Sequence, residues 1–276
     1  MTHMIYVVPS LKAKEKLQCE GKAWAESQGF AYVPRGKRTI QDLMDEYGED
    51  FLVYSSRGPQ IDRPEGSHFF SLNMAELRIQ NLRKGQRDYL LEALMGVKEY
   101  DLRPAAAQPP ISVLDCTCGF GADAAVASFG LPAGSRVDAL EVSPLLEAVT
   151  AWGFSHFVHK KDDVTAALRR ISLRCGDYRD YLLSDDGPVY DVLYFDPMFQ
   201  RPVEASCQFQ PVRAIMEHGG LTRDLIERAL QKARRRVVIK ERDFRQLCRD
   251  FPDVALYGGK YSRIGYAVLE CDSWKK

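Results

Sequence analysis

Four consecutive residues in the C-terminal half of the chain, Asp196-Pro197-Met198-Phe199, have the side chains needed to orient a planar amino group. They follow an apolar run, Val192–Phe195, that predicts a buried strand. The proline ring fixes φ and removes a backbone donor, so the turn is stiff and its carbonyl oxygens can accept hydrogen bonds. Asp196 and the Pro197 carbonyl could accept the protons of an amino group and direct its lone pair at an electrophile, while Phe199 could stack on a flat ring.

A glycine-rich junction earlier in the chain has the features of a cofactor-binding turn. An apolar run over 111–114 predicts a strand, which leads into Asp115, Gly119 and Gly121 before a helical pattern begins at Ala122. Glycines at such a junction permit a tight turn and let a ligand lie against the N-terminal amides of the following helix. By itself, the same pattern is also typical of a structural turn.

Acidic residues follow the next two predicted strands. Glu141 ends the strand predicted over 136–140, where dinucleotide folds place the acid that accepts hydrogen bonds from ribose hydroxyls. Asp177 and Tyr178 follow the strand predicted over 171–174, where they could bind the amine and the face of an adenine ring. An exposed strand end and an ordinary Gly-Asp turn are the structural interpretations of these positions.

Strands and helices must alternate to position these residues. After Pro110, strands are predicted over 111–114, 136–140, 171–174, 189–195 and 236–240, with helical segments between them. This order predicts an α/β fold with a mostly parallel sheet and helices on both faces, in which ligands bind beyond the carboxyl ends of the strands. Two last β-like runs, 254–257 and 264–269, predict a terminal hairpin that includes an antiparallel strand.

The chain is expected to have three parts. Residues 1–72 form a small N-terminal α/β domain, with strands predicted over 5–8, 31–34 and 51–55 and helices over 11–28 and 39–47. Residues 73–110 form one or two connecting helices, broken near Gly85, and a proline-rich linker. Residues 111–276 form the ligand-binding domain. His68-Phe69-Phe70 could line its site or belong to a core hairpin.

The order of the glycine turn, the two acids and Asp-Pro-Met-Phe resembles the class I S-adenosylmethionine-dependent methyltransferases over about residues 111–270. Within that class, the segments 74–78, 85–88, 196–199 and 236–243 resemble the bacterial RsmJ-like small-subunit ribosomal RNA guanine-N2 methyltransferases. The resemblance implies a Rossmann-like, seven-stranded methyltransferase sheet with S-adenosyl-L-methionine as cofactor. It also implies methyl transfer to an exocyclic guanine nitrogen in ribosomal RNA.

Site residues follow from this resemblance position by position. The cofactor is expected to be bound by residues of the turn and the strand ends: Asp115, Thr117, Gly119, Gly121, Asp123, Glu141, Val142, Asp177, Tyr178 and Asp196. The expected catalytic residues are Asp196, Pro197 and Phe199, and the expected substrate-binding residues are Arg78, Met198, Phe199 and Lys240. Arg78 and Lys240 are also typical of ordinary ion pairs. Met198 departs from the broader amino-methylating pattern, which has a second proline there, and the first 70 residues do not match the narrower family.

Charge and composition limit the partners. Lys and Arg number 38, as do Asp and Glu, so no global field attracts nucleic acid. The best candidate for a local contact with nucleic acid is the basic stretch 232–249, which is also typical of a solvated helix end beside a strand.

The seven cysteines are scattered and odd in number, which predicts reduced thiols and no metal site. Without an apolar run that could span a bilayer or a secretory signal, we expect a cytoplasmic protein that acts on RNA, with no membrane or DNA partner. The sequence does not determine the oligomeric state.

Two other functions are compatible with the same residues. The turn at Asp196 could orient any planar amino group, so a small molecule or a protein side-chain amide could be the acceptor. A catalytically silent module that binds the cofactor or RNA is the third interpretation. The acid and aromatic residue of the turn argue against silence, and the local basic stretch favours RNA.

Overall fold

The computed structural model describes residues 4–98, 108–197, 220–259 and 264–274. These residues form two compact units. Among the described residues, the first unit consists of 4–71 and 143–157, and the second of 72–98, 108–142, 158–197, 220–259 and 264–274.

The first unit is built on a five-stranded sheet. Its strands are β1 (Tyr6–Pro9), β2 (Ala31–Tyr32), β3 (Phe51–Ser55), β4 (Gly58–Arg63) and β5 (Gly66–Phe69), in the order β2-β1-β3-β4-β5. Its helices are α1 (Glu15–Ser27), α2 (Ile40–Tyr47) and α6 (Pro144–His156). β1 pairs in parallel with β2 and β3, whereas β3, β4 and β5 are antiparallel neighbours. A small apolar core contains Val8, Leu43, Phe51 and Val53.

The strands of the β4–β5 hairpin were not predicted by residue range, although a core hairpin was one of the two interpretations of His68-Phe69-Phe70. Pro59 and Pro64 interrupt the segment, and prolines lower the strand propensity of a sequence because they cannot donate to a sheet ladder. In the structure Pro59 lies opposite Tyr54 in the β3–β4 pair, and Pro64 lies in the turn between β4 and β5. His68 lies on β5 and is buried.

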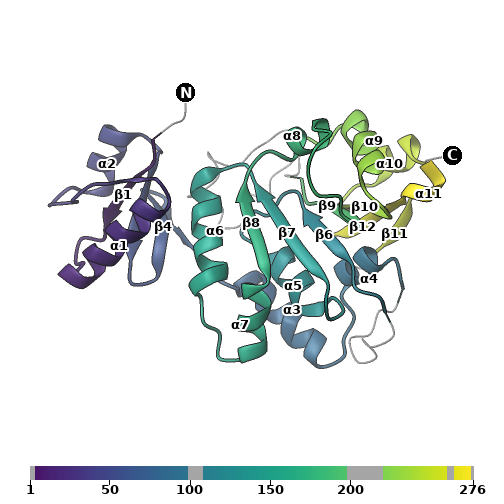
Figure 1. The fold of residues 1–276 in the computed structure, drawn as a ribbon, viewed down its shortest axis with the longest axis horizontal. Helices are drawn as coiled ribbons and strands as arrows, with labels where there is room; N and C mark the ends of the chain where they lie inside the picture. The colour runs from purple at the N-terminus through teal and green to yellow at the C-terminus, as the bar shows by residue number, and fades with distance from the viewer. Residues whose placement is uncertain (1–3, 99–107, 198–219, 260–263, 275–276) are drawn as a thin grey trace. The chain divides into compact units, whose positions relative to one another are not determined.

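The second unit contains a seven-stranded sheet. Its strands are β6 (Ser112–Asp115), β7 (Arg136–Glu141), β8 (Ile171–Cys175), β9 (Val192–Phe195), β10 (Arg236–Glu241), β11 (Ala255–Tyr257) and β12 (Gly265–Glu270). They are ordered β11-β12-β10-β9-β6-β7-β8 (Figure 1). The five strands from β8 to β10 are parallel, and β12 runs antiparallel to both β10 and β11. The predicted α/β class, seven-stranded sheet and antiparallel terminal hairpin are confirmed.

Helices cover both faces of this sheet. They are α3 (Asn73–Arg83), α4 (Tyr89–Met95), α5 (Ala122–Gly130), α7 (Asp162–Arg169), α8 (Tyr178–Leu183), α9 (Arg223–Lys232), α10 (Arg245–Asp250) and α11 (Cys271–Trp274). Leu193 and Phe195 of β9 share a core with apolar residues of α8 and α9. Tyr194, between them, points to the other face, where its hydroxyl donates to Asp123 of α5 at 2.7 Å.

The strand order reverses beside β6. From β6 the chain continues to β7 and β8, which lie on one side of β6 within the sheet, and then crosses to β9 and β10 on the other side of β6. Ligands of such sheets bind outside the carboxyl ends of the strands at this switch point. A ligand-binding site is therefore expected at the carboxyl ends of β6 and β9.

Candidate active site

The glycine turn after β6 is held by the acid at the end of β7. Gly119 and Gly121 have φ values of +54° and +76°, in the left-handed region that favours glycine. Gly121 is the N-cap of α5, and the Gly119 amide donates to Oε2 of Glu141 at 2.8 Å. Two expected cofactor-binding groups, the turn and the acid, are thus brought together at one edge of the sheet.

A second contact joins the ends of β6 and β9. The amide of Asp196 donates to Oγ1 of Thr117 at 2.7 Å, and the amide of Thr117 donates to Oδ1 of Asp115 at 3.1 Å. Asp115 is buried, and this burial raises the pKa of its carboxyl well above the ordinary value, although the Thr117 amide opposes the shift. These bonds fix the backbone from which the Asp196 side chain projects.

The Asp196 carboxylate is paired with a lysine of the neighbouring strand. In the β9–β10 register Ile239 lies opposite Phe195, so Lys240 and Asp196, the next residues, meet at the strand ends. Nζ of Lys240 lies 2.7 Å from Oδ2 of Asp196 and 2.8 Å from Oδ2 of Asp123. One ammonium therefore bridges two carboxylates.

Asp123 continues this network to the connecting helices. Its Oδ1 pairs with the Arg78 guanidinium from α3, and its Oδ2 accepts the hydroxyl of Tyr194. Arg78 in turn donates from Nε and Nη2 to both carboxylate oxygens of Asp88, each at 2.8 Å. Asp88 is also the N-cap of α4, where it accepts the Leu90 amide at 3.0 Å.

The electrostatics of this network differ between its two inner acids. Burial alone would lower the pKa of Lys240, but the carboxylates of Asp123 and Asp196 outweigh it and raise that pKa. Burial would raise the pKa of Asp123, yet Lys240 and Arg78 lower it strongly. For Asp196, burial raises the pKa, and Lys240 opposes this shift only in part. The difference has a simple cause, since Asp123 is paired with two cations and, within the described chain, Asp196 with one.

The carboxylates and the lysine at the centre of this network differ in exposure. The side chain of Asp196 is 29% exposed, against 10% for Asp123 and 15% for Lys240. A substrate can therefore reach Asp196 more readily than the other two. Lys240 and Arg78, expected as substrate-binding residues, are engaged in intramolecular ion pairs.

The expected adenine-binding pair lies at the start of α8. Asp177 is the N-cap of this helix and accepts the Arg179 amide at 2.8 Å. Tyr178 is buried and packs edge-to-face against Phe195, with ring centroids 5.4 Å apart. Val142, after β7, is half-buried, and its carbonyl lies 3.9 Å from Sγ of Cys175. The expected residues Met198 and Phe199 lie outside the described residues, whereas Pro197 is described and half-buried.

Sequence reasoning missed Asp88 and Tyr194 as members of the network. Asp88 carries a helix N-cap signal but no sign of a distant arginine partner, and Tyr194 reads as one more apolar residue of a strand. In the part of the chain that is described, no group of three or more His, Cys, Asp or Glu side chains is arranged to hold a metal ion. None of the described helices has the length and apolar character to cross a membrane.

Comparison with known proteins identifies the family. Residues 83–264 match the model of the family described as "Putative SAM-dependent methyltransferase". The chain belongs to this methyltransferase family. S-adenosylmethionine is accordingly the cofactor, and the left-handed glycine turn at the N-terminus of α5, with Glu141 beside it, fits an adenosyl ligand.

Individual relatives of this methyltransferase cover most of its length. An uncharacterized Bacillus subtilis protein, YpiP, is 28% identical over 236 residues, which are 85% of this chain and 88% of the relative. A Dechloromonas aromatica protein named ribosomal RNA small subunit methyltransferase J is 27% identical, with 72% and 76% of the two chains covered. The crystal structure of a SAM-dependent methyltransferase from Neisseria gonorrhoeae has the same fold, with a TM-score of 0.62, 18% identity and coverage of 96% and 95%.

Proposed function

We propose that this methyltransferase modifies an exocyclic amino nitrogen, N2 of a guanine in small-subunit ribosomal RNA. The observation that carries the proposal is Asp196, a partly exposed carboxylate at the switch point of the sheet, held in place by Thr117 and Lys240. Relatives named ribosomal RNA small subunit methyltransferase J support the choice of ribosomal RNA.

Residues at the carboxyl ends of β6, β7 and β8 would bind the cofactor. The amides at the start of α5 and the turn at Gly119 and Gly121 would face its amino-acid part. Glu141 would accept hydrogen bonds from the ribose hydroxyls, and Asp177 would accept one from the adenine amine. When bound, S-adenosylmethionine supplies an electrophilic methyl carbon on a positively charged sulfur.

Asp196 and the Pro197 carbonyl would bind the acceptor amine. Hydrogen bonds to its two protons orient the nitrogen lone pair toward the methyl carbon, and this alignment is the main requirement of a displacement at carbon. As the nitrogen–carbon bond forms and the carbon–sulfur bond breaks, the nitrogen becomes cationic and transfers one proton to the Asp196 carboxylate. The raised pKa of Asp196 makes it a better proton acceptor than an ordinary aspartate.

Methyl transfer from radiolabelled S-adenosylmethionine to small ribosomal subunits that lack the modification tests the proposal. Label should appear in N2-methylguanosine after nucleoside analysis. Asp196→Ala should reduce the rate about 100-fold or more, because the acceptor is misaligned, while calorimetric affinity for the cofactor stays near the wild-type value. Glu141→Ala should instead weaken cofactor affinity about 10-fold, as expected for one lost charge-assisted hydrogen bond.

Two results would overturn parts of this assignment. Transfer by Asp196→Ala at the wild-type rate would remove Asp196 from the catalytic turn. No label in RNA or subunits, despite confirmed cofactor binding, would exclude ribosomal RNA and point to a small molecule or a protein amide as the acceptor.

A further inference from the structure

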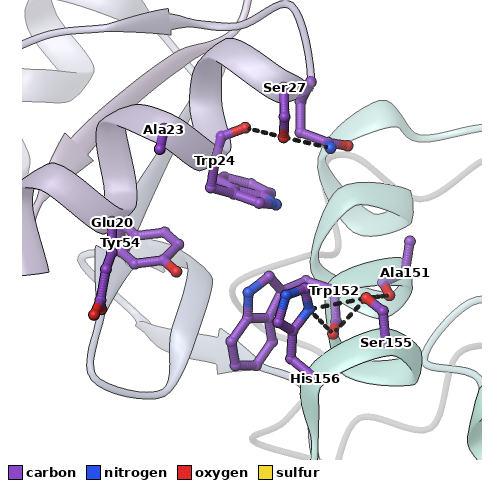
Figure 2. A pocket seen from close by; sticks show the side chains of 10 residues that line it. Glu20, Ala23, Trp24, Ser27, Tyr54, Ala151, Trp152, Ser155 and His156 are labelled. Atoms are coloured by element: carbon purple, nitrogen blue, oxygen red, sulfur yellow. Dashed lines mark hydrogen bonds between the residues drawn. The ribbon is translucent and has the colours of Figure 1, made fainter.

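The first unit contains an aromatic pocket that methyl transfer does not use. Its volume is about 730 Å³, and its lining includes Trp24, Tyr54, Trp152, His156 and Glu20. Figure 2 shows Trp24 and Tyr54 on one side of the pocket and the rings of Trp152 and His156 on the other. All these residues belong to the first unit.

The rings are arranged in two pairs. Trp24 and Tyr54 have centroids 5.6 Å apart with an interplanar angle of 35°, and Trp152 and His156 are stacked at 4.9 Å and 5°. His156 is held in this position because its Nδ1 lies 3.1 Å from the Trp152 carbonyl oxygen and 2.9 Å from Oγ of Ser155. The pocket therefore presents flat ring faces on two sides.

The backbone beneath Trp152 is adapted to its ring. Gly58 has a φ of +87°, and a Cβ at this position would lie 2.5 Å from the indole of Trp152. Any larger residue would displace the ring or the strand. The approach of this indole to β4 thus depends on a glycine.

A group of lysines adjoins the aromatic pocket. A second cavity, of about 600 Å³, shares Glu20, Tyr54 and Trp152 with the first and is also lined by Lys12, Lys14 and Lys16. The three lysines are exposed, and Lys16 pairs weakly with Glu20 at 3.9 Å. Stacking surfaces and positive charges thus lie side by side.

We propose that these two cavities bind single-stranded RNA, with one unpaired base stacked in the aromatic pocket and the adjoining phosphates at Lys12, Lys14 and Lys16. Single-stranded nucleic acid is bound elsewhere by this combination of aromatic platforms and basic grooves, because every base has a flat face and every linkage a negative charge. Glu20 would accept hydrogen bonds from base N–H groups. The inference rests on the proposed RNA substrate and deepens it, because it assigns to the first unit the capture of an RNA segment.

Tryptophan fluorescence can report on this pocket directly. Two of the three tryptophans of the chain, Trp24 and Trp152, line it, so a stacked base should quench a large part of the emission. We would titrate the full-length protein with a fluorescein-labelled, ten-nucleotide single-stranded RNA, following anisotropy, and with the unlabelled RNA, following tryptophan emission. Methyl transfer plays no part in this measurement.

Substitutions in the two cavities should affect RNA binding in a graded way. Trp24→Leu should raise the Kd for the RNA about 10-fold, in the range of one lost base–aromatic stack, and Trp24→Phe should restore most of the affinity. Lys14→Ala should also weaken binding. Lys22→Ala, on helix α1 but outside both cavities, removes an equal charge and should leave the Kd unchanged.

The outcomes separate this site from the catalytic assignment. RNA binding without tryptophan quenching, or an equal Kd for Trp24→Leu, Lys14→Ala and wild type, would overturn the RNA site even if ribosomal RNA is methylated. Quenching by a ten-residue glutamate peptide but not by RNA would overturn it in favour of a protein partner. Pocket-dependent RNA binding without methyl transfer to ribosomal RNA would support the site and contradict the proposed function instead.

Discussion

At the scale of single residues, Lys240 has the largest influence on the proposed chemistry. Its ammonium lies within 2.8 Å of both Asp123 and Asp196, and its side chain is largely buried. Two carboxylates so close to one nitrogen would repel each other without it. Lys240 thus positions Asp196, the residue proposed to bind the acceptor.

Replacing Lys240 by Met should lower the stability of the protein and change the titration of Asp196. The variant leaves two buried carboxylates with one fewer cation, so we expect the free energy of unfolding to fall by about 3 kcal/mol. The pKa of Asp196 should rise further, because its opposing charge is lost, and the acid limb of the methyl-transfer rate should move to higher pH. Urea unfolding and a pH profile of transfer would measure both changes.

Lys232→Met provides the matched control. The Lys232 ammonium donates to the backbone carbonyls of Tyr181 and Ser184. Its removal therefore leaves neither of these partners with an unpaired negative charge. This variant should leave the acid limb of the profile in place. An equal shift in both variants would mean that Lys240 does not act through Asp196.

At the scale of elements, the β4–β5 hairpin contains a buried titratable group. His68 lies on β5 and pairs in register with Ile61 of β4. Burial lowers the pKa of His68 from the ordinary 6.5 to about 4. The imidazole is therefore neutral in the folded protein at neutral pH, while the unfolded chain binds a proton near pH 6.5.

This difference predicts a pH-dependent stability of the first unit. Between pH 6.5 and pH 4 the unfolded state binds more protons than the folded state, so stability falls as the pH falls through this window and levels off below pH 4. From pH 7 to pH 5 the His68 contribution amounts to about 2 kcal/mol. Urea unfolding followed by tryptophan emission should show this loss. In His68→Phe, the fall in the free energy of unfolding between pH 7 and pH 5 should be smaller by the His68 contribution. Equal losses in both proteins would mean that His68 does not titrate as described.

At the scale of the whole molecule, charge is balanced and several residues of the expected basic surface are engaged in ion pairs. The net formal charge is zero. Within the stretch 232–249, Arg236 pairs with Glu270, Lys240 with Asp196 and Arg245 with Asp243. Ion pairs therefore neutralise part of this stretch, and the lysines of the first unit provide a separate local attraction for RNA.

A local attraction predicts a weak dependence of RNA binding on salt. Each phosphate contact on a single strand changes log K against log salt by about 0.7, so three lysines predict a slope of about −2. Anisotropy titrations of the RNA decamer at several salt concentrations would measure this slope. A slope of about −6 or steeper would show that a basic surface much wider than Lys12, Lys14 and Lys16 binds the RNA.

Much of the methyltransferase architecture was predictable because its signals are local. Alternating apolar runs and helical patterns predicted the α/β class and the antiparallel terminal hairpin, and the resemblance to methyltransferases implied the seven-stranded sheet. The structure confirms all three. Because strand ends of a parallel sheet meet at one edge, the amino-acid sequence was enough to place the Gly119 turn and Glu141 together. The roles of these residues in binding remain proposals.

Contacts between side chains far apart in the sequence were decided only by the tertiary structure. Arg78 meets Asp123 and Lys240 meets Asp196 because helix packing and strand register bring them together, which no local pattern encodes. Trp24 and Trp152 line one pocket for the same reason, although each reads in sequence as an isolated aromatic residue of a helix. Propensity and periodicity specify elements, whereas pairing between distant side chains depends on how those elements pack.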